Sequence, residues 1–213
     1  MRILMMLLLL VPQLAAAAST LECNYQEIEV DPFTKKPPYV ATEKVRLTNW
    51  LMGVINRDRG DNSEFQVSAV RERDQDFLAL KVRLRRTSGR EPSGEDIRKG
   101  LIVAKEAELL ILMADRSVIK LYSDEAVTAN TRYEIEDGAY VIDTSTTIRY
   151  RLDSSAAEQL TQQDAVRMRF NASGRLGLVN QNGNVDFTIT EKARKRFKEA
   201  IVCLHELAMV KPT

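Results

Sequence analysis

The rarest reactive side chains lie near the two ends of the 213-residue chain. Cys23 and Cys203 are its two cysteines, and His205 is its one histidine. In an exported chain, two cysteines favour a disulfide, and here the bridge would restrict an unfolded loop of about 180 residues. A redox pair is the alternative, but such pairs usually have Cys-x-x-Cys spacing. Lipidation of Cys23 is disfavoured because Glu22 stands where a lipidation motif needs a small residue.

Catalytic and metal chemistry has few candidates. Side chains two positions apart on a helix point about 200° apart, so Cys203 and His205 are not expected to form a dyad. One histidine cannot build a multi-histidine metal site, and the chain has no Gly-x-Ser-x-Gly or phosphate-binding glycine motif. A glycosidase-type carboxylate pair stays open because Asp and Glu are plentiful. We therefore assign no catalytic residue, metal or cofactor, and favour a protein that is not an enzyme.

The most regular charged pattern is three Arg-x-Arg pairs: Arg83 with Arg85, Arg149 with Arg151, and Arg167 with Arg169. Apolar residues alternate with the arginines, so each pair is expected on one strand with both guanidinium groups facing outward. A short helix expected between the second and third pairs favours a crossover, which commonly sets its two strands parallel in one sheet. The pairs could then form a basic face that binds carboxylates or phosphates bidentately.

The alternative is a solvated face on which each arginine pairs with a nearby carboxylate. Charge favours this alternative, because removal of Arg2 with an export signal leaves 30 of the 31 basic residues, against 30 acidic ones. A chain without net charge has no general attraction for polyanions, so we expect no nucleic-acid partner. An unidentified envelope partner or a polyanionic ligand, held by local patches, is the partner that remains.

The N-terminus has the pattern of a Sec-type export signal. Arg2 supplies the positive charge, Ile3–Leu14 is apolar, and Ala15–Ser19 offers the small residues that signal peptidase requires. The apolar run of about 12 residues is too short to span a bilayer, which takes about 20. We therefore predict a cleaved signal peptide over residues 1–18, one periplasmic or secreted domain over 19–213, and no transmembrane segment in the mature chain.

Period-two patterns predict an α+β protein that is mostly antiparallel sheet. The clearest hairpin is Glu64–Arg86, with its turn at Asp74-Gln75, which places Val67 opposite Val82 and Glu64 opposite Arg85.

Two further hairpins are expected. One joins residues 108–113 with 117–122, although Leu101–Met113 also contains helix-forming residues, so strand or helix stays open there. The other joins 126–135 with 139–152.

Two helices complete the expected fold. A short helix covers about 154–163 and begins with the capping-box spacing of Ser155 and Glu158. The last helix covers about 190–207 and packs on one sheet face through an apolar stripe of Ala193, Phe197, Ala200, Ile201, Leu204 and Ala208. Glycine, proline and charge predict a mobile loop at 87–100.

These patterns favour a non-catalytic periplasmic or exported binding or accessory protein whose ligand the sequence does not name. Two alternatives stay open: a carboxylate-based envelope hydrolase, and a carrier of a small apolar ligand. A pocket containing acidic residues with raised pKa values would favour the hydrolase. An elongated apolar cavity would favour the carrier.

Overall fold

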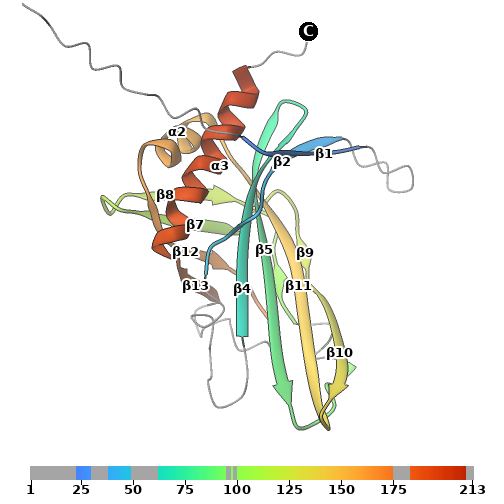
Figure 1. Cartoon of the computed structure of the whole chain (residues 1–213). Coiled ribbons are helices and arrows are strands. Elements are labelled where there is room, and N and C mark those ends of the chain that lie inside the picture. The colour runs from blue at the N-terminus through green and yellow to red at the C-terminus, as the bar shows by residue number, and fades with distance from the viewer. Residues whose placement is uncertain are drawn as a thin grey trace, which may run out of the picture.

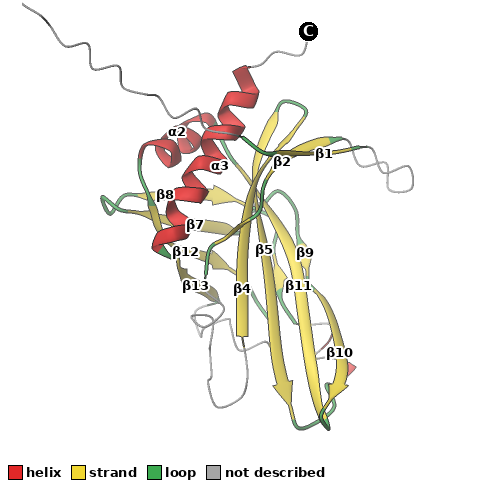
Figure 2. Cartoon of the chain, in the orientation of Figure 1, coloured by secondary structure: helices red, strands yellow, loops and turns green. Residues whose placement is uncertain are grey.

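The described chain forms two larger antiparallel sheets, one short two-stranded pairing and two helices (Figure 1, Figure 2). This arrangement confirms the predicted α+β class. The computed structural model describes residues 23–29, 38–48, 62–94, 97, 100–174 and 183–209. The predicted signal peptide, residues 1–18, lies outside this described part of the chain.

The large sheet has seven strands in the order β1-β2-β4-β5-β11-β10, with β3 paired to β4. Its strands are β1 (Tyr25–Ile28), β2 (Tyr39–Thr42), β3 (Val45–Arg46), β4 (Asn62–Glu72), β5 (Gln75–Ser88), β10 (Asn130–Glu136) and β11 (Ala139–Arg151). Figure 1 shows β5, β10 and β11 extending away from the helices and from the second sheet.

The small sheet has four strands in the order β13-β12-β7-β8. Its strands are β7 (Glu108–Met113), β8 (Val118–Tyr122), β12 (Ala165–Asn171) and β13 (Asn184–Thr188). The open question at 101–113 is thereby decided: residues 108–113 are a strand and form the expected hairpin with β8. A separate two-stranded pairing joins β6 (Ile102–Val103) to β9 (Val127–Thr128).

One hydrophobic core joins the inner faces of both sheets to the helices. Alternate residues of β4, β5 and β7 enter it, as a period of two requires. On β5, for example, Leu78, Leu80, Val82 and Leu84 are buried. Phe65 of β4 stacks on Phe187 of β13 with ring centroids 4.0 Å apart, which ties the large sheet to the small one.

The predicted β4–β5 hairpin forms, but its register was wrong by two residues. The turn is Arg73-Asp74, and Val67 lies opposite Leu80. The observed register brings Arg71 directly opposite Asp76, and the two side chains make a bidentate ion pair at 2.7 and 2.6 Å. A shift of two keeps every side chain on its expected face, so hydrophobic alternation alone could not distinguish the two registers.

The third hairpin also forms, with its turn at Asp137-Gly138 between β10 and β11. Both turn residues have positive φ, 50° and 78°, as a type I′ turn requires. Residues 127–128 of the expected first strand instead belong to β9.

The first described helix, α2 (Ser154–Gln162), is close to its predicted range. Its N-cap is Asp153, whose carboxylate accepts a hydrogen bond from the Ala156 N–H at 2.8 Å. The predicted cap at Ser155 was therefore wrong; Asp153 is also a strong capping residue and lies two positions earlier.

The last helix, α3 (Glu191–Met209), follows Thr190, whose carbonyl accepts hydrogen bonds from Ala193 and Arg194. The described stripe residues Ala193, Phe197, Ala200, Ile201 and Leu204 are all buried. They pack α3 against β2, β3 and β4 of the large sheet, and the helix also contacts α2 and β12.

The N-terminal strand is fastened to α3. The Sγ atoms of Cys23 and Cys203 lie 2.05 Å apart, the distance of a disulfide, and their Cα atoms lie 5.5 Å apart. The Tyr25 hydroxyl also donates a hydrogen bond to the Cys203 carbonyl at 2.9 Å.

Part of the expected mobile loop at 87–100 is a strand, because β5 continues to Ser88 and pairs there with Tyr140 of β11. Pro92 and Gly100 are buried as well. The mobility of the remainder stays a prediction.

Candidate functional site

The six arginines of the Arg-x-Arg pairs lie on the strands β5, β11 and β12, and each pair brackets a core residue. Leu84, Tyr150 and Met168 are the buried residues between the paired arginines. The alternation of the sequence therefore orients both arginines of each pair away from the core.

The three pairs do not share one sheet, so the expected parallel crossover was wrong. Arg149 and Arg151 lie on β11 of the large sheet, whereas Arg167 and Arg169 lie on β12 of the small sheet. The connection through α2 passes between two sheets, and the crossover rule concerns strands of the same sheet.

On adjoining strands of the large sheet the pairs are also offset. Arg83 on β5 lies opposite Ser145 of β11, and Arg149 lies opposite Ala79 of β5. No single basic face collects the three pairs.

Each of the six arginines forms an ion pair with a carboxylate on another strand or turn. The pairs are Arg83–Asp143, Arg85–Glu136 at 2.6 Å, Arg149–Glu72 at 2.7 Å, Arg151–Glu106, Arg167–Asp186 at 3.5 Å and Arg169–Asp186 at 2.8 Å. The hydrogen bond that Arg83 donates to the Asp143 carboxylate is the largest of the effects that raise the pKa of Arg83. This arrangement matches the solvated-face alternative, while anion binding by these arginines stays a prediction.

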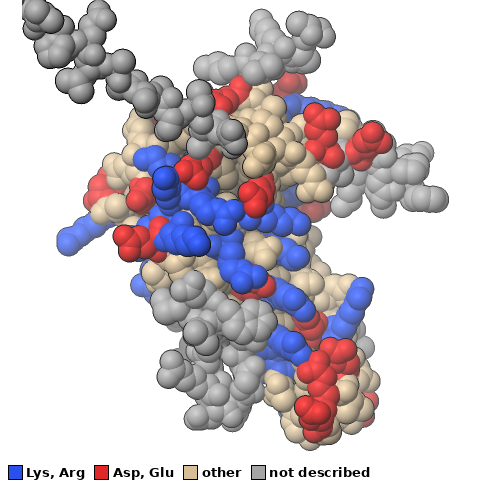
Figure 3. Space-filling view, in the orientation of Figure 1, with Lys and Arg blue, Asp and Glu red and all other residues tan. Residues whose placement is uncertain are grey.

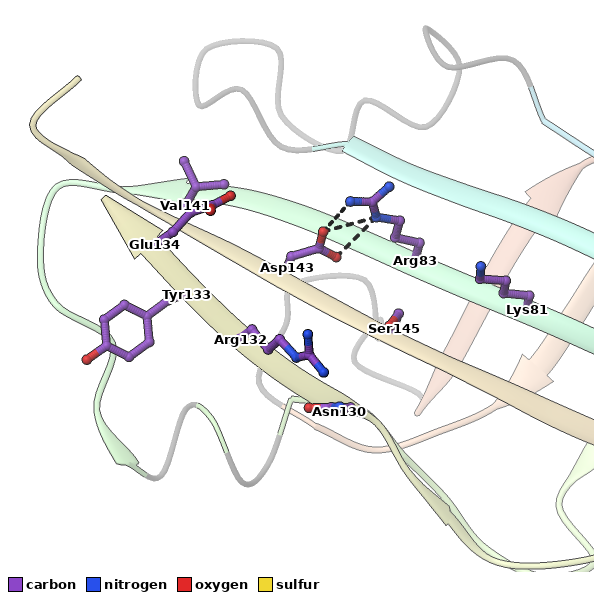
Figure 4. A pocket seen from close by; sticks show the side chains of 9 residues that line it. All are labelled: Lys81, Arg83, Asn130, Arg132, Tyr133, Glu134, Val141, Asp143 and Ser145. Atoms are coloured by element: carbon purple, nitrogen blue, oxygen red, sulfur yellow. Dashed lines mark hydrogen bonds and ion pairs between the residues drawn. The ribbon is translucent and has the colours of Figure 1, made fainter. Parts of the chain in front are cut away.

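An open polar depression of about 470 Å³ lies over β5, β11 and β10 (Figure 4). Lys81, Arg132, Asn130 and Ser145 line one part of it, and Glu134 lies beside Val141 at the other end. Asp143 lies directly opposite Arg132, but its carboxylate accepts hydrogen bonds from the guanidinium group of Arg83. The depression thus has cationic and neutral polar groups at one end and carboxylates elsewhere.

The rare side chains near the end of α3 are a disulfide-bonded cysteine and an exposed histidine. Cys203 is in the disulfide, and His205 is exposed at the rim of a crevice of about 330 Å³, which Asp74 and Asp153 also line. Within the described residues, no group of three or more His, Cys, Asp or Glu side chains is placed to hold a metal ion.

The strongest local concentration of positive charge is on α3. Its first two turns contain Lys192, Arg194, Lys195, Arg196 and Lys198, which we call the basic face of α3. Figure 3 shows lysine and arginine side chains gathered in a band that crosses α3 and continues over the large sheet. In the sequence these five basic residues lie close together within 192–198, but the pattern suggested no role for them.

Few carboxylates neutralise the basic face of α3. Arg196 contacts Glu43 at 3.3 Å, and Lys195 contacts Glu199 at 3.8 Å. Lys198 and Arg194 donate hydrogen bonds to the backbone carbonyls of Gln162 and Ile189, at 2.9 and 3.2 Å. No ion pair joins Lys192 to a carboxylate in the described part of the chain.

Known proteins give no family for this chain: no family model matches it, and no curated protein or solved structure is significantly similar to it. Among the described helices, none combines the length and the apolar composition needed to cross a membrane.

Proposed function

We propose that this chain is a non-catalytic periplasmic or secreted binding protein that holds a linear polyanion on the basic face of α3. The proposal keeps the binding role expected from the sequence and transfers it from the Arg-x-Arg pairs to the helix. The reason for the transfer is that all six arginines already have carboxylate partners, whereas the helix cations are poorly neutralised.

The observation that carries the proposal is the position of the charge along α3. Five basic residues occupy the first two turns, and the last turn contains no basic residue. The N-terminal end of a helix carries the positive end of the macrodipole, so cations are disfavoured there and favoured at the other end. Departures from local stability rules tend to occur at functional sites.

A polymer fits this surface better than a single small anion. Lys192, Lys195 and Arg196 are exposed and lie on one side of the helix, at the three- and four-residue spacing that makes side chains neighbours. The basic face runs for about 9 Å along the helix axis, from Lys192 to Lys198. Exposed charge contacts are individually weak, so useful affinity requires several charges on one ligand.

The two alternatives have less support. A hydrolase of the carboxylate type needs a pair of carboxyl groups free to act on a substrate, whereas Asp143 in the open depression is engaged by Arg83. A carrier of an apolar ligand needs an open apolar cavity, whereas the residues between sheets and helices pack into one buried cluster.

The test is retention on immobilised polyphosphate across a salt gradient. Lys192→Gln, Lys195→Gln and Arg196→Gln are combined in one variant, which changes exposed side chains only. A matched control carries Arg90→Gln, Lys105→Gln and Lys120→Gln, which are also exposed but lie outside α3. Both variants lose three positive charges.

We expect the α3 variant to elute at much lower salt than the wild type, and the control to elute close to the wild type. The loss of three contacts should also reduce the slope of log affinity against log salt by about 2. Equal shifts in both variants would mean that retention follows net charge alone, and no retention of the wild type at low salt would refute the proposal.

A further inference from the structure

Among the described residues, the second edge of β10 pairs with no strand, and we call it the open edge of the large sheet. The strand is the last in the sheet order. Every residue of β10 except Thr131 is exposed. Tyr133 is 41% exposed and Ile135 is 65% exposed, so this edge also presents apolar side chains to solvent.

The β10–β11 hairpin determines which backbone groups point to the open edge. In a two-residue hairpin the pair that flanks the turn is hydrogen-bonded, and bonded and non-bonded pairs then alternate. The flanking pair here is Glu136 with Ala139. The N–H and C=O groups of Thr131, Tyr133 and Ile135 therefore point away from β11, toward the open edge.

The side chains of β10 are complementary to themselves. If a second β10 is placed antiparallel with Tyr133 opposite Tyr133, Arg132 of each copy lies opposite Glu134 of the other. The same register places Thr131 opposite Ile135, and Asn130 opposite Glu136. No like charges oppose each other in this arrangement.

Backbone geometry agrees with the same register. The outward-pointing residues Thr131, Tyr133 and Ile135 would form the hydrogen-bonded pairs. Arg132 and Glu134 would form the non-hydrogen-bonded pairs, in which side chains approach most closely, with Cα atoms about 4.5 Å apart. Two independent properties, the backbone direction and the charge order, thus select one register.

We propose that two copies of this protein associate through β10 to form one continuous antiparallel sheet with a two-fold axis at Tyr133. The Tyr133 hydroxyl donates a hydrogen bond to Glu91 at 3.1 Å, which orients the ring without using the backbone edge.

Another open edge of the described chain lacks this complementarity. The strand β8 ends the small sheet, and its central residue is Lys120. An antiparallel copy centred there would place Lys120 opposite itself, and edge lysines are a common protection against pairing. The alternation of Arg132 and Glu134 on β10 gives no such protection.

Association through β10 leaves the basic face of α3 accessible. The helix contacts β2, β3 and β4, whereas β10 is at the far end of the sheet order. A dimer would therefore present two basic faces, and two linked faces bind one polymer more tightly than either face alone. The dimer itself does not depend on polyanion binding.

Charge reversal tests the register directly. Sedimentation velocity of the wild type is compared with Arg132→Glu, with Glu134→Arg, and with the variant that carries both changes. Each single reversal places like charges opposite each other and should leave a monomer. The double reversal restores opposite charges and should restore the dimer.

Mixing the two single variants gives the most specific outcome. Each is expected to be monomeric alone, but Glu at position 132 of one would face Arg at position 134 of the other, and the second pair would be native. The mixture should therefore form a heterodimer. Melting temperatures close to the wild-type value verify that each variant is folded.

Two results would overturn the proposal. A wild type that stays monomeric up to about 100 μM, well above the Kd of a micromolar contact, would exclude the dimer. A dimer that both single reversals leave intact would place the contact somewhere other than β10.

Discussion

The outer face of the large sheet and the outer face of α3 both contain many cations, but they differ in how those cations are neutralised. On the sheet, Arg83, Arg85 and Arg149 bond to carboxylates of neighbouring strands or turns. On α3, Lys192 and Lys195 are exposed, and the one ion pair between them and a carboxylate in the described chain is 3.8 Å long. Strand pairing places carboxylates of neighbouring strands directly beside the arginines, whereas among the helix cations of the described chain only Arg196 contacts a carboxylate from another element, Glu43.

This difference implies that α3 needs support from outside its own sequence. Lys192 and Arg194 lie in its first turn, where the helix dipole disfavours cations, whereas the buried stripe and the ties to the N-terminal strand hold it in place. The sheet face needs no such tie, because its charged groups stabilise one another. Perturbing either region should therefore have different consequences.

The largest expected effect is the loss of the Cys23–Cys203 disulfide. Its loop spans 180 residues, for which the chain-entropy model gives roughly 5 kcal/mol of stabilisation. Cys23→Ser with Cys203→Ser should lower the melting temperature by about 10–20 °C, since 1 kcal/mol corresponds to roughly 2–4 °C at this size. Calorimetry of the variant and of the reduced wild type should agree.

Thiol labelling provides the control for that experiment. Reagents for free thiols should label neither cysteine in the native, non-reduced protein, and both cysteines after reduction. Full labelling without reductant would show that the helix is held by packing alone.

A smaller change in the free energy of unfolding is expected when one arginine of a sheet ion pair is replaced, and the replacement of one lysine of the basic face of α3 is the comparison. Arg149 contacts Glu72 at 2.7 Å, and its guanidinium carbon lies 3.9 Å from the centroid of the Phe77 ring. Arg149→Gln removes a half-buried ion pair and a cation–π contact, so it should lower the free energy of unfolding by about 1–2 kcal/mol. Lys192→Gln should leave it unchanged or raise it by a few tenths of a kcal/mol, because it removes an unfavourable dipole interaction.

Urea unfolding at low and high salt measures both changes. Lys81→Gln is the matched control on the sheet, because Lys81 lies in the same large sheet but forms no ion pair with a described residue. Salt should reduce the gain from Lys192→Gln, because that side chain is exposed. If Arg149→Gln and Lys192→Gln lowered the free energy of unfolding by the same amount, the sheet cations and the helix cations would not differ in how they are neutralised.

The sequence was sufficient for features that depend on local periodicity. The α3 stripe and the strand alternation could be predicted because burial repeats every 3.6 or 2 residues. The cysteine pair could be identified because the chain has only two cysteines.

Strand register and the assignment of strands to sheets could not be predicted. A shift of two residues leaves the apolar face of β4–β5 unchanged, so the pattern did not give the true register. The sheet to which β12 belongs is determined by its partners β7 and β13. The strand β7 lies about 50 residues before β12 in the sequence, and β13 follows β12 after a connection of 12 residues. The carboxylate partner of each arginine follows from those registers, which is why the sequence alone left open whether the arginines form a basic face or pair with carboxylates.

The smallest change in stability is expected on removal of the Tyr25 hydroxyl, whose hydrogen bond is the second connection, after the disulfide, between the N-terminal strand and α3. Burial and the nearby Glu206 carboxylate raise the pKa of Tyr25. The neutral phenol is the form that donates to the Cys203 carbonyl, so its contribution is complete below the unfolded pKa and is lost as pH rises through the higher folded pKa. Because Tyr25 is 38% exposed, Tyr25→Phe should cost only about 0.5 kcal/mol at neutral pH.

The pH dependence of that cost separates the hydrogen bond from packing. Urea unfolding of wild type and Tyr25→Phe should differ by a constant amount up to pH about 9, and the difference should shrink above pH about 10, where the phenol ionises. Other tyrosines titrate in both proteins, so only the difference between the two curves reports on Tyr25. A difference that persists at high pH would mean that the ring contacts, and not the donated hydrogen bond, fasten this strand to α3.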